Sequence, residues 1–291
     1  MKIVTPLSEV VQPLRGVIFD VDGVTYNTMD HAYNWQKFVY DKMGDKSKNF
    51  DEYTDNWMNN YNKIYANEGI KGLYDKLSHV NWDNNENTIW KEYNSYNAKN
   101  SVTTIKKNGI DMADVINEVY FRGGASNQRM SRLRLGINTT KGRESLDGLL
   151  KKSGINNCFD TIITYDDILK ILVDGKIKQN QITAENIEVL RKLIPPNMKE
   201  YIEKPNSLSS MLCANAMGVS PNEIVVFEDT INGVLAYKPV MTAPRPMSAY
   251  VVGVTWGFVK DERKLLDAGA DAIINCPSEI VSILENLSAF N

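Results

Sequence analysis

Two carboxylates, one residue apart, follow a short apolar segment near the start of the chain. Residues 14–19, LRGVIF, are apolar and partly β-branched, which predicts a buried strand, and DVDG at 20–23 comes directly after it. Asp20 and Asp22 are therefore expected at the carboxyl end of a strand, where the loops of an open parallel sheet leave a crevice for ligands. Gly23 allows the backbone to turn, so that both carboxylates can reach one site. This position favours chemistry; the alternative is that the two Asp side chains only cap the following turn.

A second acidic pair is predicted at the same edge of the sheet. Glu228 and Asp229 follow the apolar residues 224–227, which have the pattern of another buried strand. Four carboxylates that converge on one crevice repel one another unless a cation lies between them. A hard divalent ion that takes oxygen ligands, keeps several waters and bridges to a phosphate is typically Mg²⁺. We therefore predict Mg²⁺ as the cofactor.

Two further polar segments have residue types suited to binding phosphoryl oxygens. Thr139 and Thr140 follow a predicted strand at 134–138, and the Thr139 hydroxyl and the backbone amides beyond it are hydrogen-bond donors. Lys204 precedes Pro205 and a segment with helical spacing of apolar residues, and it offers a positive charge. Taken alone, a Thr after a strand is usually a turn residue and a loop Lys is usually solvated.

Four segments, taken in order, resemble the motifs of haloacid dehalogenase-like hydrolases. They are FDVDGVTYNT, GINTTKGRESLDGLL, EKPNSLSSMLCANAMG and IVVFEDTINGV. More narrowly, they are similar to the phosphoglycolate phosphatase and β-phosphoglucomutase branch, whose helical cap is inserted after the first motif. The resemblance implies an α/β fold, with a Rossmann-like parallel sheet core in three α/β/α layers and an inserted α-helical cap domain.

Phosphoryl transfer needs an in-line nucleophile, a proton donor and positive charge around the equatorial oxygens. Asp20 suits the nucleophile, because a carboxylate can form an aspartyl-phosphate, and Asp22 suits the general acid and then base. Lys204 looks like the family's charge-balancing lysine, and Thr139 is expected to act with it on the phosphoryl group. Gly23, Thr139, Thr140 and Lys204 form the expected phosphate-binding set.

The resemblance also implies a set of metal ligands. They are a carboxylate oxygen of Asp20, the backbone carbonyl of Asp22, and Asp229, with Glu228 either bound to the ion or next to a ligand.

The sequence departs from the branch in four places. Thr140 stands where Asn is common, and Asn27 stands where an acidic residue is usual. Long insertions occupy residues 174–203 and 238–248. Because the first of them separates Lys204 from the third predicted strand, Lys170 is its rival as the site lysine.

Two regions of the chain differ in composition and in the spacing of their apolar residues. Residues 28–122 are rich in Asn, Tyr, Lys and Trp with helical spacing of apolar residues, and we predict that they form the cap. Residues 1–27 and 123–291 are predicted to form a discontinuous core, because strand patterns alternate with helical patterns there. Its predicted strands are 14–19, 134–138, 159–164, 224–227, 250–254 and 272–274.

Composition excludes several classes of partner and compartment. The 291 residues have a formal net charge of -3, which offers no electrostatic footprint for nucleic acid or an anionic membrane. No segment is apolar enough to span a bilayer, and the first 16 residues do not have the pattern of a signal peptide. Cys158, Cys213 and Cys276 are odd in number and widely spaced, which predicts reduced thiols in the cytoplasm.

The leading hypothesis is a Mg²⁺-dependent phosphatase that hydrolyses a small phosphorylated metabolite through an aspartyl-phosphate. The first alternative is a sugar phosphomutase of the same fold, which would return the phosphoryl group to a second substrate hydroxyl. The second is a catalytically degenerate member that binds a ligand or a partner without turnover. The substrate itself and the oligomeric state are left open by the sequence.

Overall fold

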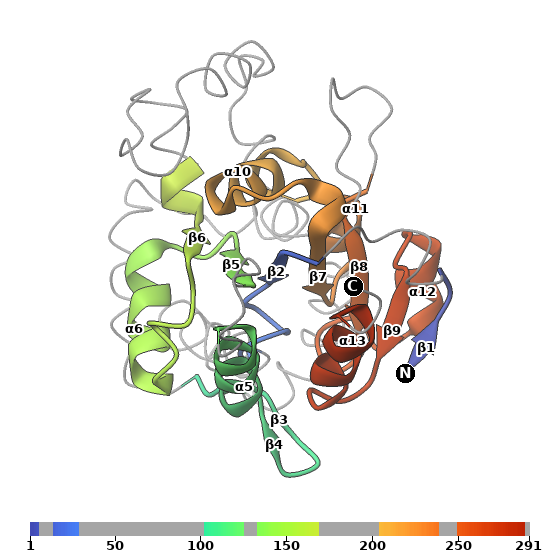
Figure 1. The fold of residues 1–291 in the computed structure, drawn as a ribbon, viewed down its shortest axis with the longest axis horizontal. Coiled ribbons are helices and arrows are strands. Elements are labelled where there is room, and N and C mark those ends of the chain that lie inside the picture. Colours follow the sequence, from blue (N-terminus) through green and yellow to red (C-terminus); the bar gives the residue numbers. More distant parts are fainter. Residues whose placement is uncertain (6–13, 29–101, 125–132, 169–203, 239–248, 289–291) are drawn as a thin grey trace, which may run out of the picture.

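The core of the chain is one mixed sheet covered by helices on both faces (Figure 1). The computed structural model describes residues 1–5, 14–28, 102–124, 133–168, 204–238 and 249–288. Seven strands lie in the order β1-β9-β8-β7-β2-β5-β6. Their bounds are β1 Lys2–Ile3, β2 Gly16–Phe19, β5 Arg134–Asn138, β6 Thr161–Ile163, β7 Ile224–Glu228, β8 Tyr250–Val254 and β9 Ala272–Ile274. Every neighbouring pair is parallel except β1 and β9, so the predicted parallel core is confirmed.

Successive side chains along the strands belong alternately to two separate apolar clusters, one on each face of the sheet. In β2, Val17 and Phe19 belong to one cluster and Ile18 to the other, and all three are fully buried. The helices of the first face are α5 Met112–Gly124, α6 Arg143–Ser153 and α13 Glu279–Ser288. Those of the second face are α10 Leu208–Met217, α11 Ile231–Leu235 and α12 Glu262–Asp267. The three-layer α/β/α architecture expected from the sequence follows from this alternation.

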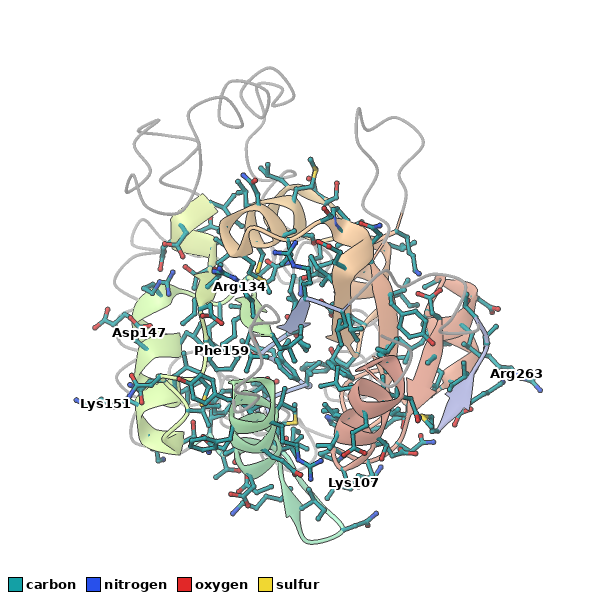
Figure 2. The ribbon with its side chains drawn as sticks, viewed as in Figure 1. Lys107, Arg134, Asp147, Lys151, Phe159 and Arg263 are labelled. Atoms are coloured by element: carbon teal, nitrogen blue, oxygen red, sulfur yellow. The ribbon has the colours of Figure 1, made fainter. Side chains whose placement is uncertain are left out.

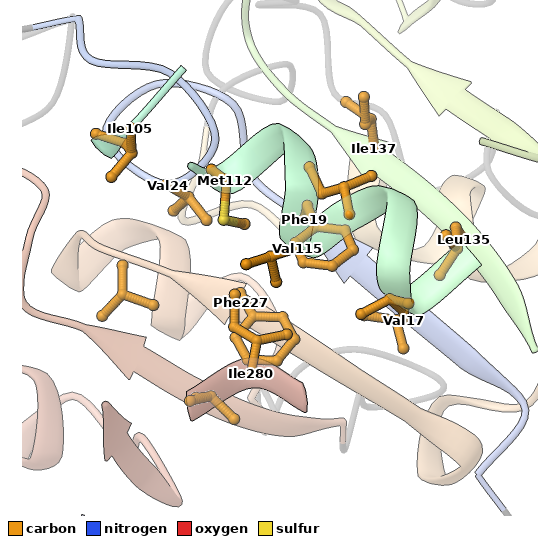
Figure 3. Packing of buried hydrophobic residues seen from close by; sticks show 14 of the residues in the cluster. Val17, Phe19, Val24, Ile105, Met112, Val115, Leu135, Ile137, Phe227 and Ile280 are labelled. Atoms are coloured by element: carbon orange, nitrogen blue, oxygen red, sulfur yellow. The ribbon is translucent and has the colours of Figure 1, made fainter. Parts of the chain in front are cut away.

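Helix α5 packs over the centre of the sheet (Figure 3). Met112 and Val115 on this helix lie in the same cluster as Phe19 and Phe227, whose rings stack at a centroid distance of 5.3 Å. The helix follows a hairpin of β3 Lys106–Lys107 and β4 Ile110–Asp111. The sequence pattern assigned this segment to the cap, whereas its described residues pack against the core. The division at 28–122 stays a prediction, because the other predicted cap helices lie outside the described residues.

Helix α6 shows how the predicted amphipathic pattern is used. Asp147 and Lys151 project from its outer side, and Phe159, just after the helix, points inward (Figure 2). Phe159 meets the ring of Phe19 edge to face at 6.4 Å. Gly154, with φ of 72°, ends the helix in the left-handed conformation, as the sequence indicated.

The edge strand β1 has no counterpart in the sequence prediction. Its two residues are too short for a periodic pattern, and it is held by tertiary hydrogen bonds instead. The backbone N–H groups of Val4 and Thr5 both donate to the carbonyl of Asp271, at 2.9 and 3.1 Å. Within the described residues, no helix has the length and apolarity required to cross a membrane.

The strand order places a ligand crevice at the carboxyl end of β2. The chain's next core strand, β5, lies on one side of β2, and β7 lies on the other. Loops therefore leave the sheet in opposite directions at this point, which is where open α/β sheets bind ligands.

The close packing of α10 on β5 generates the first prediction. A Cβ at Gly136 would lie 2.6 Å from the sulfur of Met217 and 3.1 Å from that of Cys213, whereas one at Gly148 on α6 would meet nothing within 4 Å. We expect Gly136→Ala to lower the free energy of unfolding by about 1–3 kcal/mol through overpacking. The matched control, Gly148→Ala, is expected to raise it by roughly 0.5–1 kcal/mol, because Gly is unfavourable inside a helix. Denaturant unfolding of both variants measures the difference, and equal effects would contradict this account of the packing.

Candidate active site

Lys204 joins two acidic residues from neighbouring strands. Asp20 comes directly after β2, and Glu228 is the last residue of β7. The ammonium Nζ of Lys204 donates to Oδ1 of Asp20 and to Oε1 of Glu228, both at 2.6 Å, and to the backbone carbonyl of Asn138 at 3.2 Å. All three charged side chains are at most 11% exposed. The structure thus brings Lys204 to the acidic edge, whereas its rival Lys170 lies outside the described residues.

Burial controls the protonation of this cluster. It raises the pKa of Asp20, with Lys204 opposing and Asp22 reinforcing the shift. Burial likewise raises the pKa of Glu228 to about 8 and that of Asp229 well above its usual value. Although burial alone would lower the pKa of Lys204, its two carboxylate partners raise it well above the usual value. The cluster therefore contains more acidic groups than one lysine can hold ionised.

Three of the acidic side chains fit a hard cation. Asp20, Glu228 and Asp229 each offer a carboxylate oxygen, and these oxygens lie within 4.8 Å of one another. Oε2 of Glu228 and Oδ1 of Asp229 are buried without a hydrogen-bond partner among the described residues. Unpartnered buried oxygens are costly, and an all-oxygen set of this kind is what Mg²⁺ takes. The donor set present thus suits the predicted ion.

Glycines leave the space that these carboxylates occupy. A Cβ at Gly23, whose φ is 83°, would lie 2.0 Å from Oδ2 of Asp229, and one at Gly257 would lie 2.1 Å from the same oxygen. A Cβ at Gly233 would lie 1.9 Å from Oε2 of Glu228. Because these approaches are shorter than any side chain allows, the acidic edge needs glycine at all three positions. The turn after β8 adds a donor, since the backbone N–H of Phe258 donates to Oδ2 of Asp229 at 2.7 Å.

The second carboxylate of the first motif has a lysine of its own. Nζ of Lys141 lies 3.0 Å from Oδ1 of Asp22, and the two side chains are 8% and 18% exposed. The turn that carries Asp22 is fixed by Thr25, whose hydroxyl donates to the carbonyl of Asp20 at 2.7 Å. Lys141 was not predicted as a site residue, and its place directly after Thr139 and Thr140 was the only signal in the sequence.

Thr139 and Thr140 follow β5 at the same edge. Thr139 is buried, and its hydroxyl oxygen accepts a hydrogen bond from the backbone N–H of Lys141 at 3.1 Å. Its own N–H donates to the carbonyl of Ile163 at 3.0 Å, which fixes the turn against β6. Thr140 is half-buried beside it. The structure therefore gathers the expected residues from β2, β5 and β7 at one edge.

A buried polar network, which the sequence did not reveal, lies behind Lys204. The side-chain amide of Asn138 donates to the hydroxyl oxygens of Tyr237 and Ser210, at 2.6 and 3.2 Å. All three side chains are fully buried. Lys204 donates to the backbone carbonyl of the same Asn138, so this network helps to fix the position of the lysine ammonium.

Comparisons with known proteins agree with this geometry. The family model described as haloacid dehalogenase-like hydrolase matches residues 17–187. Similar solved structures include a hydrolase from Pseudomonas syringae, with 14% identity and a TM-score of 0.59 over 94% of this chain and 98% of that chain. They also include a predicted phosphoglycolate phosphatase from Haemophilus somnus, with 15% identity and a TM-score of 0.59 over 93% and 98% of the two chains. A third is a β-phosphoglucomutase from Clostridium difficile, with 16% identity and a TM-score of 0.54 over 95% and 98%.

No curated protein sequence matches the chain. The solved structures share its fold at low sequence identity. The family model, however, covers more than half of the residues and includes Asp20, Asp22, Thr139 and Lys141. The chain therefore belongs to the haloacid dehalogenase-like hydrolases.

Proposed function

We propose that the protein is a Mg²⁺-dependent phosphatase that hydrolyses a small phosphorylated metabolite through an aspartyl-phosphate on Asp20. The observation that carries this proposal is the placement of Asp20 at the centre of the sheet edge, bound to Lys204 within a buried acidic cluster. A structural carboxylate needs no such surroundings, whereas a nucleophile must be fixed in line with its substrate.

The reaction is proposed in two steps. A carboxylate oxygen of Asp20 attacks phosphorus, the bond from phosphorus to the ester oxygen breaks, and Asp22 gives its proton to the departing alkoxide. Water then attacks the phosphorus of the aspartyl-phosphate, and Asp22, now ionised, takes a proton from that water. The bond to Asp20 breaks, which releases inorganic phosphate and restores both side chains.

The phosphoryl oxygens are proposed to bind at the ends of β5 and β2. Lys204 supplies a fixed positive charge beside Asp20, and the turn at Thr139 and Thr140 supplies hydroxyl and amide donors. Gly23 is proposed to belong to this phosphate-binding set through its backbone, because Oδ2 of Asp229 fills the space that a side chain at this position would need.

Mg²⁺ would be held by Asp20 and Asp229, with the backbone carbonyl of Asp22 and with Glu228 as a ligand or a neighbour of one. When bound, the ion supplies positive charge that screens the phosphoryl group from the carboxylates. The count of charges supports a bound cation. With Asp22 protonated for the first step and the other three acidic groups ionised, Lys141 and Lys204 leave one negative charge at the edge.

The substrate is proposed to be selected by a helical cap inserted after the first motif. The two ends of the inserted segment are hydrogen-bonded side by side at the active site, with Asn27 N–H donating to the carbonyl of Thr103 at 2.9 Å and Ile105 N–H to that of Thr25 at 3.0 Å. The segment between them therefore leaves and rejoins the core next to Asp20. A cap placed there would exclude bulk water during turnover.

A phosphomutase remains the alternative enzyme, because the proposed first step is common to both reactions. One of the similar structures is a β-phosphoglucomutase and another a predicted phosphoglycolate phosphatase, and the chain shares its fold with both. The residues that would position a second substrate hydroxyl for attack on the aspartyl-phosphate are expected in the cap, outside the described residues.

We also propose a reducing compartment such as the cytoplasm. The three cysteines are free, and Cys158 and Cys213 are buried. Structural disulfides are typical of oxidising compartments, and none is formed here.

The proposed chemistry predicts that removing the carboxylate of Asp20 and removing that of Asp22 lower turnover by different factors. With 4-nitrophenyl phosphate and Mg²⁺, we expect Asp20→Asn to lose turnover by roughly 10⁴-fold or more, since no aspartyl-phosphate can form. Asp22→Asn is expected to lose about 10²–10⁴-fold, the usual contribution of a general acid and base. Steady-state kinetics and acid-quench detection of the phosphoenzyme measure both losses.

The matched control for these variants is Asp147→Asn on the outer side of α6, where the side chain is 59% exposed. It should retain wild-type turnover. Full activity in Asp20→Asn would contradict the proposed nucleophile. Absence of turnover by the wild type across a panel of phosphate esters, with tight binding of beryllium fluoride, would instead favour the degenerate binding protein.

The raised carboxyl pKa values predict how Mg²⁺ affects stability. The pKa of Glu228 is about 8 in the fold against an ordinary 4.5, so the metal-free fold binds extra protons between these values and loses stability as the pH rises through them. Because Mg²⁺ binds the ionised carboxylates, we expect it to raise Tm more at pH 8 than at pH 6. Binding at about 100 times Kd adds roughly 2.7 kcal/mol. Thermal unfolding with Mg²⁺ and with EDTA at both pH values provides the measurement.

Two variants test the assignment of this stabilisation to the acidic cluster. Asp229→Asn should abolish the gain from Mg²⁺, since it removes a proposed ligand. Asp267→Asn, on the exposed surface of α12, should retain the whole gain. An equal Tm rise in both variants would place the ion elsewhere.

A further inference from the structure

Lys141 lies at the acidic edge, and the proposed chemistry has so far used only its charge. Its ammonium lies 3.0 Å from Oδ1 of Asp22, although its side chain belongs to a turn from which it could extend into solvent. Its backbone is fixed at both ends, because its N–H donates to the Thr139 hydroxyl and its carbonyl accepts from the N–H of Tyr165 at 3.3 Å. The lysine is therefore directed at Asp22 from a rigid support.

The burial of this pair argues against an incidental contact. Exposed ion pairs contribute little, but a lysine side chain that is only 8% exposed needs a partner to offset the lost hydration of its charge. Oδ1 of Asp22 is also buried and has no hydrogen-bond partner among the described residues, so its contact with Lys141 is an ion pair. Each group thus has the other as its counter-charge, and removing the lysine would leave Oδ1 of Asp22 buried without a compensating charge.

We infer that Lys141 is a positioning residue, which holds the Asp22 carboxylate in the orientation required for proton transfer to and from the substrate. The inference rests on the proposed function, because it takes Asp22 as the general acid and base. Lys204 and Lys141 then have different roles at this edge. Lys204 holds the nucleophile, and Lys141 holds the group that moves the proton, each from a different segment of the chain.

The dependence on the leaving group can separate this role from direct substrate binding. A 4-nitrophenolate departs with little need of a proton, whereas the alkoxide of glycerol phosphate needs one from Asp22. We expect Lys141→Met to lower kcat for glycerol phosphate by about 10²-fold, as a misplaced catalytic group does, with less effect on 4-nitrophenyl phosphate. KM should change less than roughly threefold, and Lys141→Arg should restore part of kcat.

A double-mutant cycle provides the sharper test. If Lys141 acts through Asp22, the variant with both Lys141→Met and Asp22→Asn should be no slower than Asp22→Asn alone. Lys152→Met removes an exposed lysine from α6 and is the matched control, expected to keep wild-type kinetics. Thermal unfolding of each variant separates loss of the fold from loss of positioning.

Additive losses, or a KM that rises equally with both esters, would overturn the inference while leaving the proposed phosphatase intact. Hydrolysis of neither ester by the wild type would instead count against the proposed function. The inference would then be decided by crystal structures of the wild type and Lys141→Met. A displaced Asp22 carboxylate in the variant would support it, and an unmoved one would overturn it.

Discussion

The charge at the carboxyl edge of β2 and β7 is the constraint on which the rest of the structure depends. Asp20, Glu228 and Asp229 lie within 4.8 Å of one another in a buried environment, and such a group is unstable without compensation. Lys204 reaches it from outside the sheet and binds two of its members. The remaining oxygens of Glu228 and Asp229 have no partner among the described residues, so the edge suits a further cation. The same arrangement that costs stability thus prepares a site for phosphoryl transfer.

The loops around this edge bring their backbone close to the carboxylates. Gly23, Gly233 and Gly257 come from three different loops, and each leaves space that a carboxylate oxygen fills. Beneath them the sheet is rigid, because both faces of β2 are fully buried under helices. The stacked rings of Phe19 and Phe227 join the two strands that carry the acidic residues. A rigid base with glycine-lined loops can hold charged groups in place to within fractions of an ångström.

Much of the core could be predicted from residue patterns. The strands at 134–138, 250–254 and 272–274 were predicted with the observed bounds, because each is a short segment with apolar residues that lies between turn signals. Helix α5 was harder. Its apolar stripe at Val115, Ile116 and Val119 correctly indicated a helix, but a stripe does not say which surface covers it. In the described structure it packs on the core sheet. Strand β1 was not predicted, because a segment of two residues is too short to show the alternating pattern of a strand.

The sequence by itself determined the fold class and the acidic residues of the site, since four ordered motifs placed Asp20, Asp22, Glu228 and Asp229 after apolar strands. The resemblance also named Lys204, with Lys170 as its rival, but only the tertiary structure shows Lys204 bound to the acidic edge and adds Lys141. Lys204 reaches Asp20 across 184 residues of chain, and Lys141 faces Asp22 from the turn after β5. Local spacing reports on strands and turns, because their hydrogen bonds join near neighbours or follow a regular period. A buried ion pair between distant segments depends instead on strand order, so no pattern along the chain specifies it.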